Sequence, residues 1–149
     1  MAYNQSSCLK PAFVIFAAQL ALCSPSAFAW CADHPTVAEE FGRSAVVLVA
    51  KVVAEEKVIA SGDYVDGINY RLSVSEVLRG EQKKSLTLFS EDSSGRFPMK
   101  VGESYLVFAS AEQGLLPGQP AFTVNNCGNS GLLSESQPKL QEVRRLAKR

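Results

Sequence analysis

The segment 68–75 constrains the fold of this chain more than any other stretch. Apolar and polar residues alternate along it without a break: Ile68, Tyr70, Leu72 and Val74 are apolar, and Asn69, Arg71, Ser73 and Ser75 lie between them. A period of two is the period of a β-strand that buries one face and exposes the other. The sequence therefore predicts a half-buried strand that continues to a turn at residues 79–80.

Four further segments are predicted to be strands. They lie at residues 45–53, 85–90, 104–109 and 121–125, and turn-rich segments such as 61–67 separate the strands. The first half of 45–53 is apolar at odd and even positions alike, which indicates burial on both faces. Residues 35–44 and 137–149 carry apolar side chains at helical spacing, so a helix is expected at each of these places.

The number and spacing of these elements predict the fold class. Five short strands at near-even spacing, with no helical crossover between them, favour an antiparallel barrel or sandwich. Two flanking helices fit an OB-type barrel best. We therefore expect a mainly β protein, a five-stranded antiparallel OB-type barrel flanked by a short N-terminal helix and a C-terminal helix. The chain has 149 residues, 46% hydrophobic and 20% charged, which suits one globular domain.

The first 29 residues have the organisation of a cleaved secretory signal. A short polar segment with one basic residue, Lys10, precedes a mostly apolar run at 11–22, and small residues then lead to Ala29. An uncleaved membrane anchor is the alternative, but the run is shorter than the ~20 residues that span a bilayer. We expect cleavage after Ala29, which gives a signal peptide at 1–29, a mature domain at 30–149, and a secreted or periplasmic protein.

Cleavage at this position would leave two of the four cysteines, Cys31 and Cys127. An even pair in an oxidising compartment predicts one disulfide. Closing a loop of roughly 100 residues would stabilise the fold by roughly 4–5 kcal/mol in the chain-entropy model. The alternative is a metal site that combines both cysteines with His34, but structural zinc sites use four ligands and only three are available. We therefore expect a disulfide, no bound metal and no cofactor.

Few residues are suited to catalysis or to nucleic-acid binding. His34 is the only histidine, and the sequence holds no Gly-x-Ser-x-Gly elbow and no glycine-rich phosphate loop. The acidic pairs at 55–56 and 91–92 would diverge on a strand or lie in a loop. Phosphate binding needs clustered Lys and Arg, whereas 15 basic residues here are balanced by 15 acidic ones without a basic block. We expect a protein that is not an enzyme, has no catalytic residues and binds no nucleic acid.

The order of several motifs along residues 30–149 resembles a known family. The motifs are Cys-Ala-Asp-His at 31–34, the predicted helix and first strand at 41–53, Tyr-Arg-Leu-Ser-Val-Ser-Glu-Val-Leu-Arg-Gly at 70–80, Val-Gly-Glu-Ser-Tyr-Leu-Val-Phe-Ala at 101–109, and Asn-Cys-Gly at 126–128. Together they resemble the N-terminal, netrin-like domain of the tissue inhibitors of metalloproteinases (TIMP), in the reduced form of bacterial secreted proteins. The resemblance implies an OB-type barrel whose N-terminal cysteine is tied to the body by a disulfide.

The resemblance also implies a binding mode. In the animal inhibitors, the free amine and carbonyl of the first cysteine chelate the zinc of a target protease. Carried onto this sequence, the chelating residue would be Cys31, and Ala32, Asp33 and His34 would enter the cleft. The family opens with Cys-x-Cys, whereas this chain has Asp33 at the second cysteine position. Trp30 would precede Cys31 after the expected cleavage, so the free amine would belong to Trp30 and chelation by Cys31 would be blocked.

Two functions follow from these observations. The first, which we expect, is a non-enzymatic binding module that contacts a protein partner, with a metalloprotease among the candidates, through its tethered segment of Trp30, Cys31, Ala32, Asp33 and His34. The second is an envelope-associated scaffold that uses the basic end of the C-terminal helix, which carries Arg144, Arg145, Lys148 and Arg149. Docking of that helix onto the barrel is expected in preference to membrane contact. Zinc-metalloprotease inhibition ranks below both functions.

Overall fold

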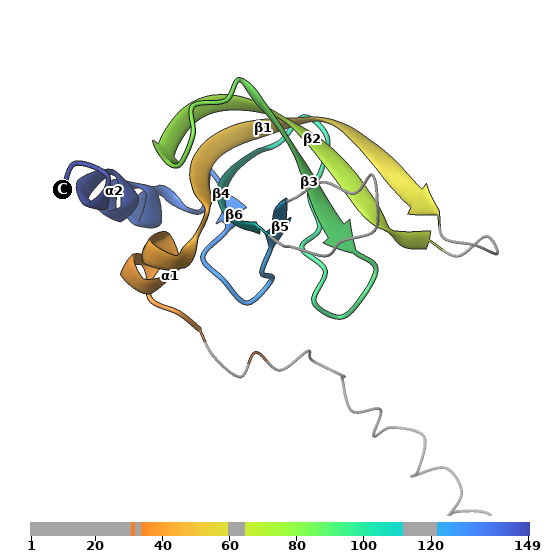
Figure 1. The fold of residues 1–149 in the computed structure, drawn as a ribbon, viewed down its shortest axis with the longest axis horizontal. Coiled ribbons are helices and arrows are strands. Elements are labelled where there is room, and N and C mark those ends of the chain that lie inside the picture. The colour runs from red at the N-terminus through yellow and green to blue at the C-terminus, as the bar shows by residue number, and fades with distance from the viewer. Residues whose placement is uncertain (1–30, 32–33, 60–64, 112–121) are drawn as a thin grey trace, which may run out of the picture.

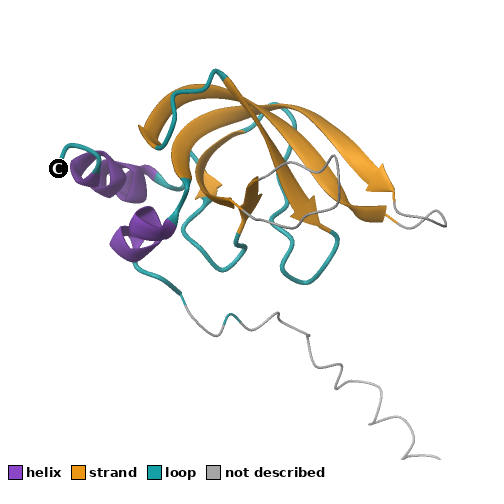
Figure 2. Ribbon diagram, in the orientation of Figure 1, coloured by secondary structure: helices purple, strands orange, loops and turns teal. Residues whose placement is uncertain are grey.

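The predicted strands form a small barrel, and both helices pack at one side of it (Figures 1 and 2). The structure is a computed structural model that describes residue 31 and residues 34–59, 65–111 and 122–149. Its elements are α1 (Val37–Arg43), β1 (Val46–Ile59), β2 (Val65–Arg79), β3 (Ser85–Glu91), β4 (Ser104–Ala111), β5 (Phe122–Val124), β6 (Gly131–Leu132) and α2 (Gln137–Leu146). The predicted signal at 1–29 and the predicted boundary after it lie outside the described residues.

Five strands close the barrel in the order β1-β2-β3-β5-β4, and β4 pairs back to β1. Every pairing in this circuit is antiparallel except that of β3 with β5, which run parallel where Phe89 faces Thr123. Five strands cannot alternate in direction all the way round a closed barrel, so one parallel pair is unavoidable. The predicted fold class, a mainly β five-stranded barrel with two flanking helices, is confirmed. The expectation that all pairs are antiparallel is wrong at this pair.

The interior of the barrel is filled by alternate residues of its strands. The alternation predicted at 68–75 is confirmed, because Ile68, Tyr70 and Leu72 are buried while Arg71 and Ser73 are exposed. The inward side chains of β1, β3 and β4 join those of β2 in one core, which includes Leu48, Leu88 and Val107.

A second core lies outside the barrel, beneath the helices. β1 is buried on both faces over its first five residues, as the first half of the apolar run at 45–53 predicted, and β4 is buried on both faces at its centre. Their outward side chains pack with α2 in a cluster of buried residues, namely Val47, Val49, Leu106, Phe108, Leu140 and Val143. Residues of α1 pack against the same cluster from the side. The helices are therefore fixed on the outer face of β1 and β4.

A capping box starts α1 at Val37, later than the sequence suggested. The Thr36 hydroxyl accepts a hydrogen bond from Glu39 N at 3.3 Å, and the Glu39 carboxylate accepts one from Thr36 N at 2.8 Å. These bonds satisfy N–H groups that the first turn of a helix leaves free. The bond from the Thr36 backbone, followed by one from its hydroxyl, also holds the pKa of Glu39 below its ordinary value. Pro35 precedes the cap and is not in the first turn.

The hairpin of β1 and β2 is longer than expected. β1 continues beyond residue 53 to Ile59, and β2 begins at Val65, inside the turn predicted at 61–67. The register of β1 against β2 shifts between Val52 and Ala54, so the side-chain period changes there. Because of this shift and the charged residues at 55–57, the apolar pattern of the sequence does not predict the second half of β1. The sequence also gave no sign of β6, which pairs with β4.

Candidate functional site

A disulfide between Cys31 and Cys127 fixes the N-terminal segment to the barrel. Their Cα atoms are 5.6 Å apart, and the bond joins positions 96 residues apart in the sequence. The predicted pairing is confirmed. Because the two sulfur atoms are bonded to each other, the alternative metal site with His34 does not form in this structure. Cys127 lies in the loop that follows β5.

Hydrogen bonds within that loop give it a defined shape. The side-chain oxygen of Asn125 accepts a bond from Cys127 N at 2.9 Å, and the Asn125 carbonyl accepts one from Gly128 N at 3.1 Å. A Cβ atom at Gly128 would collide with the carboxylate of Glu40 in α1. The absence of a side chain at Gly128 therefore allows the loop to lie directly against α1.

Asn129 makes a second attachment between the loop and the N-terminal segment. Only 8% of this residue is exposed. Its Nδ2 donates to the Pro35 carbonyl at 2.9 Å and to Glu40 Oε2 at 2.7 Å, and its backbone N–H donates to the same Oε2 at 2.5 Å. One residue thus holds both α1 and the segment before it. We refer to the disulfide and these Asn129 contacts together as the N-terminal anchor.

Ser130 connects the N-terminal anchor to the barrel. Its hydroxyl accepts a hydrogen bond from Phe108 N at 2.8 Å and donates to the Phe108 carbonyl at 3.4 Å. Phe108 belongs to β4 and is part of the outer core. These hydrogen bonds therefore attach the loop after β5 to β4, one of the most buried strands.

The structure locates part of the predicted partner-binding segment. Cys31 and His34 are described, whereas Trp30, Ala32 and Asp33 lie outside the described residues. His34 is exposed and stands directly before Pro35, whose carbonyl Asn129 holds. Cys31 and Pro35, on either side of residues 32–34, are thus both attached to the loop that follows β5. The contact of residues 30–34 with a partner stays a prediction.

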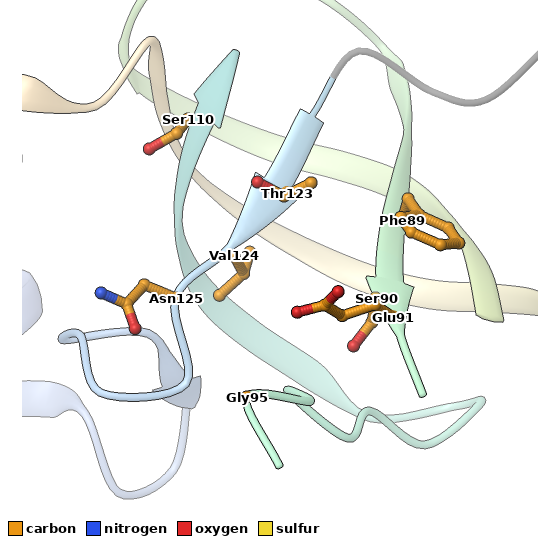
Figure 3. A pocket seen from close by; sticks show the side chains of 8 residues that line it. All are labelled: Phe89, Ser90, Glu91, Gly95, Ser110, Thr123, Val124 and Asn125. Carbon is orange, nitrogen blue, oxygen red and sulfur yellow. The ribbon is translucent and has the colours of Figure 1, made fainter. Parts of the chain in front are cut away.

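A pocket of about 410 Å³ lies between the ends of β3, β4 and β5 (Figure 3). The described residues that line it are Phe89, Ser90, Glu91, Gly95, Ser110, Thr123, Val124 and Asn125. Among these lining residues only Glu91 carries a charge, and its carboxylate points from β3 toward β5 in Figure 3. Glu91 Oε1 accepts a hydrogen bond from the Ser93 hydroxyl at 3.0 Å. Because Asn125 also bonds to Cys127, the pocket adjoins the N-terminal anchor.

The basic end of α2 is the other surface that the sequence singled out. Leu140 and Val143 are buried against the barrel, so the expected docking of the apolar face is confirmed. Arg144 forms two hydrogen bonds to the Glu76 carboxylate on β2, at 3.1 and 2.7 Å, and Arg145, Lys148 and Arg149 are exposed. This surface offers positive charge, and its apolar residues are already used by the core.

Within the described ranges, no group of three or more His, Cys, Asp or Glu side chains is placed to hold a metal ion. Of the helices in the part of the chain that the structure describes, none combines the length and the apolar character needed to cross a membrane.

The sequence did not reveal the roles of Asn129 and Glu40. These residues are 89 positions apart, and no local period links residues at such a distance. The one available signal was the position of Asn129 in the Cys-Gly-Asn run after Cys127, where a small polar residue follows a cysteine and a glycine. The capping box of α1, in contrast, is readable as the Thr-x-x-Glu pattern at Thr36.

No family model matches this sequence, and no curated protein matches it either. The structure confirms only coarse features that the resemblance to the inhibitor family implied. These are a small five-stranded barrel and a disulfide. The closer resemblance therefore stays a prediction.

Proposed function

We propose that this protein is a non-enzymatic binding module that contacts a protein partner through residues 30–34. The observation that carries the proposal is the N-terminal anchor, which attaches the segment at Cys31 and again at Pro35. A disulfide is consistent with an extracytoplasmic location. We further propose that residues 1–29 are a signal peptide removed after Ala29 and that the protein is secreted or periplasmic.

Attachment at both ends favours binding for an energetic reason. Fixing the backbone of one residue costs roughly 1–2 kcal/mol, and a segment that becomes ordered only in the complex lowers the affinity by that cost. Here the covalent bond at Cys31 and the hydrogen bond at Pro35 attach both sides of this segment to the loop after β5 before any partner arrives. The same short sequence on a free chain end would bind more weakly.

The pocket beside the N-terminal anchor supplies a second contact in this proposal. Its volume is in the range of sites that enclose small ligands, so it can accept one side chain of the partner. The Glu91 carboxylate favours a side chain with a positive charge. We expect Glu91→Gln to weaken partner binding, whereas Glu103→Gln, an exposed carboxylate at the opposite end of β4, should not.

A site-specific crosslink tests the proposal directly. A photo-crosslinking amino acid at His34 should capture one defined protein from the secreted or envelope fraction. The same amino acid at Lys84, which is exposed at the end of β3 remote from the pocket, should not capture it. Asn129→Ala should reduce the yield at His34, and Asn126→Ala, exposed in the same loop, should leave it unchanged. Equal capture at His34 and Lys84 would contradict the proposal.

Inhibition of a zinc metalloprotease is a narrower form of the same proposal, and it requires Cys31 to be the first residue of the mature chain. Intact mass measurement with N-terminal sequencing distinguishes a chain that begins at Trp30 from one that begins at Cys31. We expect Trp30 and therefore no inhibition across a panel of metalloproteases at micromolar concentrations. Inhibition by a chain that begins at Trp30 would show that chelation by Cys31 is not required.

A further inference from the structure

The second half of β1 has one edge without a strand partner in the part of the chain that the structure describes. β1 pairs with β4 from Val46 to Lys51, and backbone hydrogen bonds with residues 102–103 extend that contact to Val52. From residue 53 to residue 59, β1 pairs with β2 alone. Figure 1 shows this end of the β1–β2 hairpin projecting past the other strands. Such an edge presents a row of backbone N–H and C=O groups to any strand that approaches it.

We propose that two copies of this chain pair through this edge, as antiparallel strands related by a two-fold axis at Glu56. Most homo-oligomers are symmetric, and a two-fold axis brings the same surface of each copy together. In this register Glu55 faces Lys57 of the second copy, and Lys57 faces Glu55 of the second copy. Opposite charges that face each other across two strands stabilise the pair. The edge is therefore complementary in charge to itself.

The symmetry restricts the register to a few choices. Facing side chains in a sheet lie on the same side of it, so a two-fold antiparallel pair must place one residue opposite its own copy. An axis at Glu55 would set that carboxylate against itself and leave Lys57 without a facing carboxylate. An axis at Lys57 would set two ammonium groups against each other and leave Glu55 opposite Ile59. Only the axis at Glu56 pairs Glu55 with Lys57.

The same register brings exposed apolar side chains together. Ile59 is 64% exposed, and the axis at Glu56 brings it to the end of the second copy's strand where Val53, 45% exposed, lies. Val53 is the extra residue at the register shift between Val52 and Ala54, so the two side chains lie near each other and not in exact register. Removing apolar surface from water stabilises the contact. Glu56 faces its own copy, which is unfavourable, but Arg71 lines the same surface depression and brings positive charge close to that point. Charged residues normally protect an open edge. Here the order of the charged residues 55–57 favours pairing with a second copy in one register.

Charge reversal tests this register. The assay is sedimentation velocity at low salt over a range of concentrations, with the purified protein in its disulfide-bonded form. The parent should shift from monomer to dimer as its concentration rises. Lys57→Glu replaces two attractive pairs with two repulsive ones, and we expect the dimer dissociation constant to rise about 10- to 100-fold. The swapped variant Glu55→Lys/Lys57→Glu restores both attractive pairs and should return the dissociation constant to within a few-fold of the parent.

Lys84→Glu is the matched control, because it reverses an exposed lysine in the turn before β3 and should leave the dimer unchanged. Circular dichroism should show that all variants are folded. Restored dimerisation in the swapped variant supports the pairing even if Lys57→Glu alone folds poorly. A parent that stays monomeric at every concentration, or a dimer that Lys57→Glu does not weaken, would overturn the proposal. The N-terminal anchor is unchanged in each variant, so these outcomes leave the proposed partner binding unaffected.

Discussion

At the scale of single residues, Asn129 is expected to stabilise the fold through its hydrogen bonds. It is almost fully buried and donates to the Pro35 carbonyl and the Glu40 carboxylate. Asn129→Ala would leave the Pro35 carbonyl without this donor, while the backbone N–H of residue 129 would still donate to Glu40. A buried polar group that loses its partner costs about 1–3 kcal/mol. We expect that loss in the free energy of unfolding, measured with urea. Asn126→Ala should stay within about 0.5 kcal/mol of the parent. Equal losses in the two variants would contradict the role of Asn129.

Glu39 should make the stability of α1 depend on pH. Its hydrogen bonds from Thr36 lower the pKa of the folded carboxyl below the ordinary value of 4.5. A carboxyl with a lowered pKa stabilises the fold above its unfolded pKa, and this contribution is lost as the pH falls through the folded pKa. The parent should therefore exceed Glu39→Gln in unfolding midpoint at neutral pH, and the difference should shrink below about pH 4.5. A difference that is constant with pH would argue against this account.

At the scale of elements, the patterns that depend on neighbouring residues were readable from the sequence. The alternation at 68–75 and the apolar runs located every strand of the barrel, because burial on one face or on both leaves a local signature. The parallel contact of β3 with β5 and the short strand β6 could not be read, because they depend on how distant segments meet. The end of β1 was also missed, since charged residues at 55–57 interrupt its apolar pattern.

The docking of α2 onto the barrel gives a prediction at this scale. Leu140 is buried between α2 and the outer face of β1 and β4. Removing most of a buried leucine side chain costs about 2–5 kcal/mol through lost transfer energy and the cavity that remains. We expect Leu140→Ala to lower the free energy of unfolding by that amount in urea. Gln141→Ala, exposed on the same helix, is the control and should have little effect. A small effect of Leu140→Ala would mean that α2 contributes little to the core.

At the scale of the whole molecule, the disulfide links the two ends of the barrel sequence. Removing a native disulfide from a small domain typically costs 2–5 kcal/mol. We expect the double variant Cys31→Ser/Cys127→Ser to lose about this much stability in urea. Reducing the parent with a thiol should produce the same loss, and the reductant should not affect the double variant. If the reductant destabilised the parent and the double variant equally, its effect would not come from the disulfide.

The candidate site could be predicted only where it depends on the cysteines. The number of cysteines and the compartment expected from the predicted signal led directly to the bond between Cys31 and Cys127. The attachment by Asn129 and the pocket near Glu91 arise from loops that the fold brings together, and their residues are separated widely in the sequence. Local sequence patterns carry no information about contacts between distant segments, so the pocket and the attachment by Asn129 could be found only in the structure.

The disulfide also has a consequence for proteolysis. Because it joins Cys31 to Cys127, the backbone between them and the bond together form a covalent ring, and α2 lies outside that ring. A single cut anywhere inside the ring would leave both pieces linked, and only the addition of a thiol would separate them on a gel. A cut between Cys127 and α2 would instead release the helix that covers the outer core. A protease would therefore damage this protein most by a cut in the segment between Cys127 and α2.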